Sequence, residues 1–164
     1  MSEETQYFRM REEAEVGEGE ARFLNVFRDV LGLEVERDLV LRPVFGHNLT
    51  LSFVSMRPHS VAPVHQHPQE QIGTVIEGSY EFELAGQKRV VRRGDVYMVP
   101  PNVPHGAVTH EEGCLVLDVF SPPREAFDEI MAQAVAELGR DGAGEVWTLP
   151  PLRDAGGGHA PGAP

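Results

Sequence analysis

The chain has a single cysteine, Cys114, so no disulfide can form within it and a reducing compartment suits it. Basic residues are also few, because 14 Lys and Arg stand against 26 Asp and Glu, giving a formal net charge of -12. A surface this acidic repels phosphate groups, so we expect no nucleic acid and no anionic membrane as partners. No apolar run approaches the ~18 residues of a membrane span, and the charged N-terminus lacks the apolar segment of an export signal. We therefore expect a cytoplasmic protein.

The length of 164 residues is sufficient for one domain with one core. Acidic residues crowd the first twenty positions, which predicts a flexible acidic arm over residues 1–20. The last stretch, rich in Gly, Ala and Pro, predicts an extended and partly disordered tail over 141–164. A single domain is therefore expected over 21–140.

Between about residues 39 and 120 the chain alternates apolar and polar residues, which is the pattern of short half-buried strands. The stretch NLTLSFVSM alternates Leu49, Leu51 and Phe53 with polar neighbours, and SYEFEL does the same further on. Turn sequences such as AGQ, RGD and EEG separate the runs. This even spacing predicts an all-β sandwich or small barrel.

Helical spacing is found outside that region. SPPREAFDEIMAQAVAELG predicts a C-terminal helix over about 122–139, with Ser121 as its N-cap and Gly139 at its end. Residues 21–32, ARFLNVFRDVLG, also have helical spacing, although a pair of strands is the alternative.

Two histidines stand one residue apart in VHQHPQEQIGTVIEG. On a continuous strand His65, His67 and Gln71 point to the same face, and His105 follows a short strand and a proline-rich loop. Three imidazoles and one oxygen are suitable ligands for a single divalent ion such as Zn, Ni, Fe, Co or Mn. The alternative is a histidine pair on the surface without function. Glu70 could replace Gln71 as the oxygen ligand, although its parity is opposite to that of the histidines.

A carboxylate interrupts the apolar strand CLVLDVF. Asp118 shares one strand face with Cys114, Val116 and Phe120, and burying it is costly unless it is paired. The alternative is a solvent-facing carboxylate or one satisfied in a turn. Arg124 lies in the first turn of the expected helix, where a positive charge opposes the helix dipole, so it is a second candidate for a functional role. The alternative is a charge on the helix surface.

The spacing of these residues resembles the two motifs of the cupins. His65-x-His67-x3-Gln71-x6-Gly78 is similar to the first motif, with Gln in the usual glutamate position. Gly94-x5-Pro100-x-Asn102-x2-His105-x3-Thr109 is similar to the second, with Asn and Thr replacing the usual Gly and Asn. The resemblance implies a cupin jelly-roll β-barrel with a C-terminal α-helix, one divalent metal per chain and, at this size, a homodimer.

The pair HPQEQIGTVIEG and LDVFSPPREAF looks like the KdgF-type pectin-degradation cupins. That resemblance implies metal ligation by His65, His67, His105 and Gln71, and roles in activity for Asp118, Phe120 and Arg124. The expected function is metal-dependent isomerisation of a small unsaturated sugar acid, the linearisation of a 4,5-unsaturated uronate. The alternatives are a quercetinase-like dioxygenase and a non-catalytic module that binds metal or a sugar acid.

Overall fold

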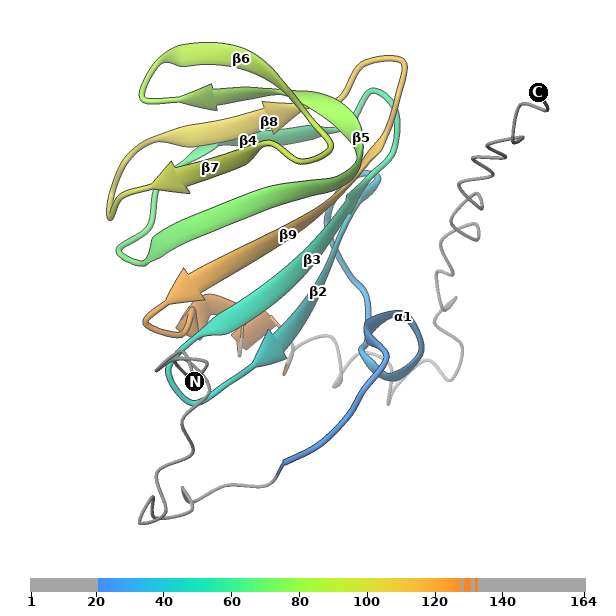
Figure 1. The fold of residues 1–164 in the computed structure, drawn as a ribbon, viewed down its shortest axis with the longest axis vertical. Coiled ribbons are helices and arrows are strands. Elements are labelled where there is room, and N and C mark those ends of the chain that lie inside the picture. The colour runs from blue at the N-terminus through green and yellow to red at the C-terminus, as the bar shows by residue number, and fades with distance from the viewer. Residues whose placement is uncertain (1–20, 128, 131, 133–164) are drawn as a thin grey trace, which may run out of the picture.

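The structure is a computed structural model that describes residues 21–127, 129, 130 and 132. One short helix precedes nine strands in chain order (Figure 1): α1 Val26–Asp29, β1 Leu33–Glu36, β2 Leu39–Phe45, β3 Thr50–Met56, β4 Val61–His65, β5 Glu70–Leu84, β6 Gln87–Arg92, β7 Val96–Val99, β8 His105–Val108 and β9 Cys114–Ser121.

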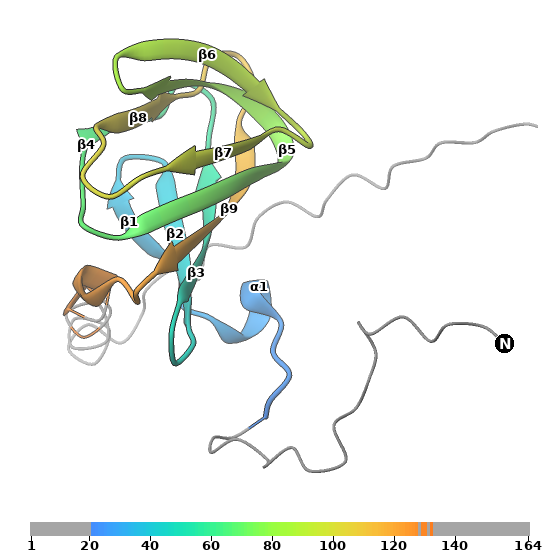
Figure 2. The same cartoon turned by 60° about the vertical axis from the view of Figure 1, so that its left-hand side comes forward.

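All nine strands form one antiparallel sheet whose order is β1-β2-β3-β9-β5-β8-β4, with β6 and β7 also paired to β5. The long strand β5 joins the two halves of the sheet. Its first part pairs with β7 and β9, and its second part pairs with β6 and β8. Figure 2 shows the sheet curling around so that β1 and β4, the two ends of this order, approach the same side. The all-β jelly-roll barrel expected from the sequence is confirmed.

The core lies inside the barrel and is formed by alternate residues of the strands. Tyr80, Phe82 and Tyr97 form its aromatic part, with Phe82 and Tyr97 ring centroids 4.3 Å apart. The first half of β3 faces the opposite way from the one its hydrophobicity predicts, because Thr50 and Ser52 are fully buried. Leu51 and Phe53 lie on the outer face, where Phe53 packs on Phe27 of α1 with ring centroids 6.1 Å apart.

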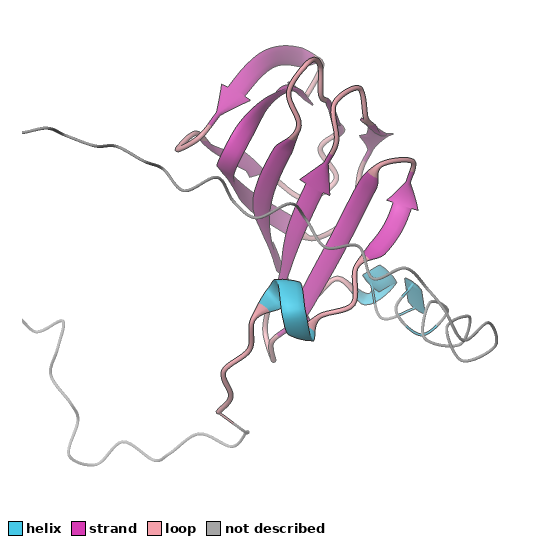
Figure 3. Ribbon diagram, turned by 90° about the vertical axis from the view of Figure 1, so that its right-hand side faces the viewer, coloured by secondary structure: helices cyan, strands magenta, loops and turns pink. Residues whose placement is uncertain are grey.

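The two ends of the chain differ in part from the sequence expectations. Residues 21–32 contain only the four-residue α1, capped by Asn25 through hydrogen bonds from the backbone N of Phe27 and Arg28, before β1 begins (Figure 3). At the other end, helical residues start at 125, so the expected helix begins three residues late. Ser121 is not its N-cap, because it is the last residue of β9 and its hydroxyl donates to the Asn48 carbonyl.

Residues 133–139 of the expected C-terminal helix, the arm over 1–20 and the tail over 141–164 lie outside the described residues. Within the part that is described, no helix is long and apolar enough to cross a membrane.

Candidate metal centre and active site

Strand register brings polar residues from four strands into one row across the barrel interior. Ser52 of β3 is the partner of Asp118 on β9, which is the partner of Gly73 on β5, and Gly73 is the partner of Tyr97 on β7. The next row toward the end of the barrel contains Gln71 beside Phe120. Side chains two residues apart on a strand share a face, so Asp118 and Gln71 both point inward.

Three histidines meet at this end of the barrel. His65 is the last residue of β4 and is the strand partner of His105, the first residue of β8, while His67 lies in the loop after β4. One ring nitrogen from each of the three lies within 4.8 Å of the others. The structure thus brings together the three histidines that the sequence motifs singled out.

The tautomer of each histidine is fixed by the backbone. The Nδ1 atoms of His65, His67 and His105 lie 2.8, 3.1 and 2.8 Å from the carbonyl oxygens of Pro63, Gln69 and Val103. A carbonyl oxygen can only accept, so each Nδ1 carries the proton and each Nε2 presents a lone pair. Nε2 of His105 is buried without a hydrogen-bond partner among the described residues.

The side-chain oxygen of Gln71 adds a fourth acceptor to the Nε2 atoms of the three histidines. Its Oε1 lies 3.0 Å from Nε2 of His67, and its amide group hydrogen-bonds to Asp118. A carboxylate accepts from an amide N–H, so the amide nitrogen of Gln71 faces Asp118 and its oxygen faces the histidine. The two atoms are close enough for one divalent ion to contact both, and this donor set fits such a metal.

Glu70, the alternative oxygen ligand, is exposed on the opposite face of β5 and pairs with Ser121 at the edge of the barrel. Gln71 is 5% exposed and lines the cavity beside the histidines. The buried position of Gln71 and the exposed position of Glu70 are those expected from the sequence, but the continuous strand assumed for His65, His67 and Gln71 is not observed, because β4 ends at His65 and β5 begins at Glu70.

The electrostatic surroundings keep the buried imidazoles neutral. Burial is the main cause that lowers the pKa of His105 to about 4, and the neighbouring His65, His67 and Arg124 act in the same direction. Burial, Arg124 and His65 also lower the pKa of His67, against hydrogen bonds that raise it. A neutral imidazole is the form that binds a metal ion.

Asp118 is buried and belongs to a short hydrogen-bond chain. The Tyr97 hydroxyl donates to its Oδ1 at 2.6 Å, and Tyr80 in turn hydrogen-bonds to Tyr97. Burial raises the pKa of Asp118 to about 6, although the hydrogen bonds from Tyr97 and Gln71 and the charge of Arg124 oppose that rise. A carboxyl group with a pKa near neutrality can take up and release a proton during catalysis.

Gly73 leaves the space that this carboxylate occupies. A methyl group on Gly73 would overlap the Tyr97 ring and Oδ1 of Asp118. A glycine at this point of β5 is thus a packing requirement of the site.

Arg124 covers the same end of the barrel. Its guanidinium carbon lies 5.2 Å from the Phe120 ring centroid and 5.0 Å from that of Phe127, and Phe120 makes an edge contact with His67 at 5.4 Å. Burial lowers the pKa of Arg124, and Asp118 raises it. Arg124 therefore holds a partly desolvated positive charge near the histidines, where an anion can bind.

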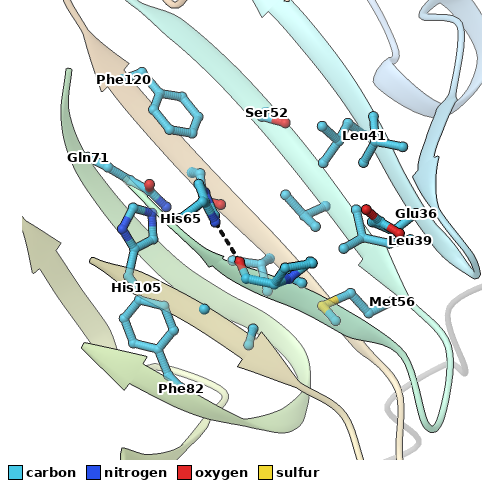
Figure 4. Close-up of a pocket in the computed structure, with 18 of the residues that line it drawn as sticks. Glu36, Leu39, Leu41, Ser52, Met56, His65, Gln71, Phe82, His105 and Phe120 are labelled. Carbon is cyan, nitrogen blue, oxygen red and sulfur yellow. Dashed lines mark hydrogen bonds between the residues drawn. The ribbon is translucent and has the colours of Figure 1, made fainter. Parts of the chain in front are cut away.

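These groups surround a cavity of about 430 Å³. His65, His105 and Gln71 line it (Figure 4), and so do Asp118 and Arg124. His67 is not part of the wall of this cavity. The sequence did not indicate Tyr97, Tyr80, Gly73 or Ser52. The local pattern was compatible with ordinary core positions for the two tyrosines and with a polar outer face for Ser52. Only the pairing of distant strands places these residues around Asp118.

Comparison with known proteins identifies the family to which this fold and site belong. Residues 52–120 match the cupin domain family. The KdgF pectin degradation protein of Dickeya dadantii (strain 3937) is 34% identical over 98 residues, which cover 59% of this chain and 86% of that protein. The jelly-roll barrel and the histidine motifs together define a cupin.

Two solved structures are similar to this one. KdgF from Halomonas sp. is 34% identical with a TM-score of 0.60, covering 66% of this chain and 99% of that one. An RmlC-like cupin from Shewanella frigidimarina NCIMB 400 is 29% identical with a TM-score of 0.60, covering 65% and 96% of the two chains. The chain belongs to the cupin family, as a KdgF-like member.

Proposed function

We propose that this KdgF-like cupin takes part in pectin degradation as a metal-dependent isomerase that linearises a 4,5-unsaturated uronate. The observation that carries the proposal is the buried carboxylate of Asp118, which hydrogen-bonds to Gln71 and lines one cavity with Gln71, His65 and His105. Gln71 also contacts His67 of the histidine cluster. Similarity to the KdgF pectin degradation protein supports the choice of substrate. The homodimer expected from the family resemblance stays a prediction.

His65, His67, His105 and Gln71 would hold the metal, which supplies a Lewis acid that polarises substrate oxygens when bound. Four neutral ligands leave the full charge of the ion available for an anionic, oxygen-rich substrate. The positive charge of Arg124 would bind the substrate carboxylate.

Asp118 would move the proton. It accepts the proton of the anomeric hydroxyl as the carbonyl forms and the bond between the anomeric carbon and the ring oxygen breaks. The former ring oxygen becomes the oxygen of the enol. The enol becomes a ketone when the neighbouring carbon of its double bond takes up a proton. One proton leaves oxygen and one is added to carbon, so the reaction is an isomerisation. The hydrogen bonds from Tyr97 and Gln71 hold the Asp118 carboxyl group in position for this transfer.

Metal-loaded protein is expected to speed the loss of the conjugated enol-ether absorbance of 4,5-unsaturated galacturonate above its spontaneous rate. An ultraviolet progress curve measures this, with heat-denatured protein as the control. An unchanged rate contradicts the isomerase. Oxygen consumption with a flavonol would then indicate the quercetinase-like dioxygenase instead.

Gln71→Glu is expected to retain the metal, because a carboxylate oxygen binds a divalent ion at least as well as an amide oxygen. Turnover should fall about 10- to 100-fold, since the variant quenches the charge of the ion and loses the hydrogen bond to the Asp118 carboxylate. Metal analysis and turnover of one preparation measure both effects.

Glu70→Gln is the matched control for Gln71→Glu, because it changes the neighbouring exposed position, and it should alter neither quantity. The ligand assignment is wrong if Gln71→Ala keeps both metal and turnover while Glu70→Ala loses them.

A further inference from the structure

The cavity is divided into a polar end and an apolar end. Figure 4 shows Gln71, His65 and His105 on one side and Leu39, Leu41 and Met56 on the other. Strand register explains this division. Past the row of Asp118, the next inward row across β2, β3 and β9 is Leu41, Val54 and Val116, and the row after it is Leu39, Met56 and Cys114.

The opposite wall is also apolar over this stretch. Ala62 of β4, Ala107 of β8 and Phe82 of β5 are register partners and face the same cavity. Two alanines side by side keep the space open. Rows two residues apart are about 6.6 Å apart along a strand, so the apolar end extends for about 13 Å beyond Asp118. We call the space lined by Leu39, Leu41, Val54, Met56, Ala62, Phe82, Ala107 and Val116 the apolar chamber.

A hydroxyl group placed in the apolar chamber would lose its hydrogen bonds to water, which is costly when no partner replaces them. The buried hydroxyls of Tyr80 and Tyr97 are already linked to each other and to Asp118. Glu36, on the exposed edge strand β1, lines the chamber and places a negative charge at the end away from Arg124. The charges therefore orient an acid with its carboxylate toward Arg124 and its remainder toward the chamber.

We propose that the apolar chamber binds a hydrocarbon portion of a carboxylic acid whose acid group lies at Arg124 and the histidine cluster. The inference rests on the proposed function for the acid end only, and it extends the substrate class to unsaturated acids that carry an alkyl or aromatic group. Such a ligand removes the apolar walls from water without burying unpaired hydroxyls.

Isothermal titration calorimetry of the metal-loaded full chain with acetate, phenylacetate, 3-phenylpropionate and 4-phenylbutyrate tests the proposal. Affinity is expected to rise along the phenyl series by about fourfold for each added methylene, the gain for burying one such group. Phenylacetate should bind more tightly than acetate, and 3-phenylpropanol, which lacks the acid, should bind more weakly than 3-phenylpropionate. Equal affinities across the acids, or equal binding of the alcohol and the acid, overturn the proposal.

Val54→Thr provides a nearly isosteric test, because it adds a hydroxyl to the chamber wall. It should lower the affinity for 3-phenylpropionate about tenfold and leave the affinity for acetate unchanged. Val96→Thr is the matched control, since Val96 is 64% exposed and is not among the residues lining the cavity. Equal effects of the two variants contradict the proposal, and the wild-type series decides the question if Val54→Thr does not fold.

The isomerase activity and the ligand of the apolar chamber can be contradicted independently of each other. A wild-type protein that turns over the unsaturated uronate but shows a flat acid series has the proposed activity without the chamber ligand. A protein with no turnover but a rising series has the chamber ligand without the proposed activity.

Discussion

Asp118→Asn is expected to lower turnover of the unsaturated uronate by ~10²–10⁴-fold, the usual contribution of a general acid or base. Asn cannot accept and release a proton, although it has nearly the same shape as Asp. The metal content should stay near that of the wild type, because the three histidines are unchanged.

The hydrogen-bond chain around Asp118 can adapt to this substitution. The Asn oxygen can keep the hydrogen bond from Gln71, while the Asn amide donates to the Tyr97 hydroxyl, which then turns its own proton toward Tyr80. The melting temperature should therefore be equal to that of the wild type or slightly higher, because a buried charge is removed.

Measuring turnover, metal content and melting temperature on one preparation distinguishes a catalytic role of Asp118 from a structural one. Glu111→Gln is a suitable control, since its side chain is 94% exposed. Near-normal turnover combined with a lower melting temperature would mean that Asp118 serves the fold and not the reaction.

His65→Ala/His105→Ala is expected to remove nearly all of the metal, which should be close to one ion per chain in the wild type, and to abolish turnover with it. The pair supplies two of the three lone-pair nitrogens in the cluster. Inductively coupled plasma mass spectrometry of dialysed protein measures the loss.

A thermal scan with and without a chelator adds a second readout. An ion at 100 times its dissociation constant stabilises the folded state by about 2.7 kcal/mol, so chelation should lower the melting temperature of the wild type but not of the variant. His110→Ala, at an exposed histidine outside the cluster, should behave as the wild type does. Full metal occupancy in His65→Ala/His67→Ala would end the metal hypothesis.

Local pattern was sufficient to predict the strands, because alternation is a property of neighbouring residues. The continuous strand expected through His65, His67 and Gln71 is not observed, since β4 ends at His65 and β5 begins at Glu70. The histidines were grouped by their resemblance to the cupin motifs, and the pairing of β4 with β8 brings His65 and His105 together. The face of Asp118 was also predicted correctly, because Val116 and Phe120 on the same parity are buried with it.

The inverted face of β3 could not be predicted in this way. The pattern of Leu51 and Phe53 predicts that those two side chains face inward, yet Ser52 and Thr50 face the barrel interior, because Ser52 is the register partner of Asp118 and Thr50 that of Phe120. Parity tells which residues share a face, but which face points inward depends on pairing with a strand more than sixty residues away. The contacts of Tyr97 and Gly73 with Asp118 depend on similar long-range pairings.

The carbonyl contacts of the three histidines have a consequence for metal selection. Because each ring is already held through Nδ1, the site is preorganised, and the conformational entropy of chelation is lost during folding and not when the ion arrives. Neutral nitrogen and oxygen donors hold several divalent ions in the same way, with affinities that follow the general order of the first transition row. We therefore expect the metal supply of the cell to decide which of these ions the proposed centre would bind.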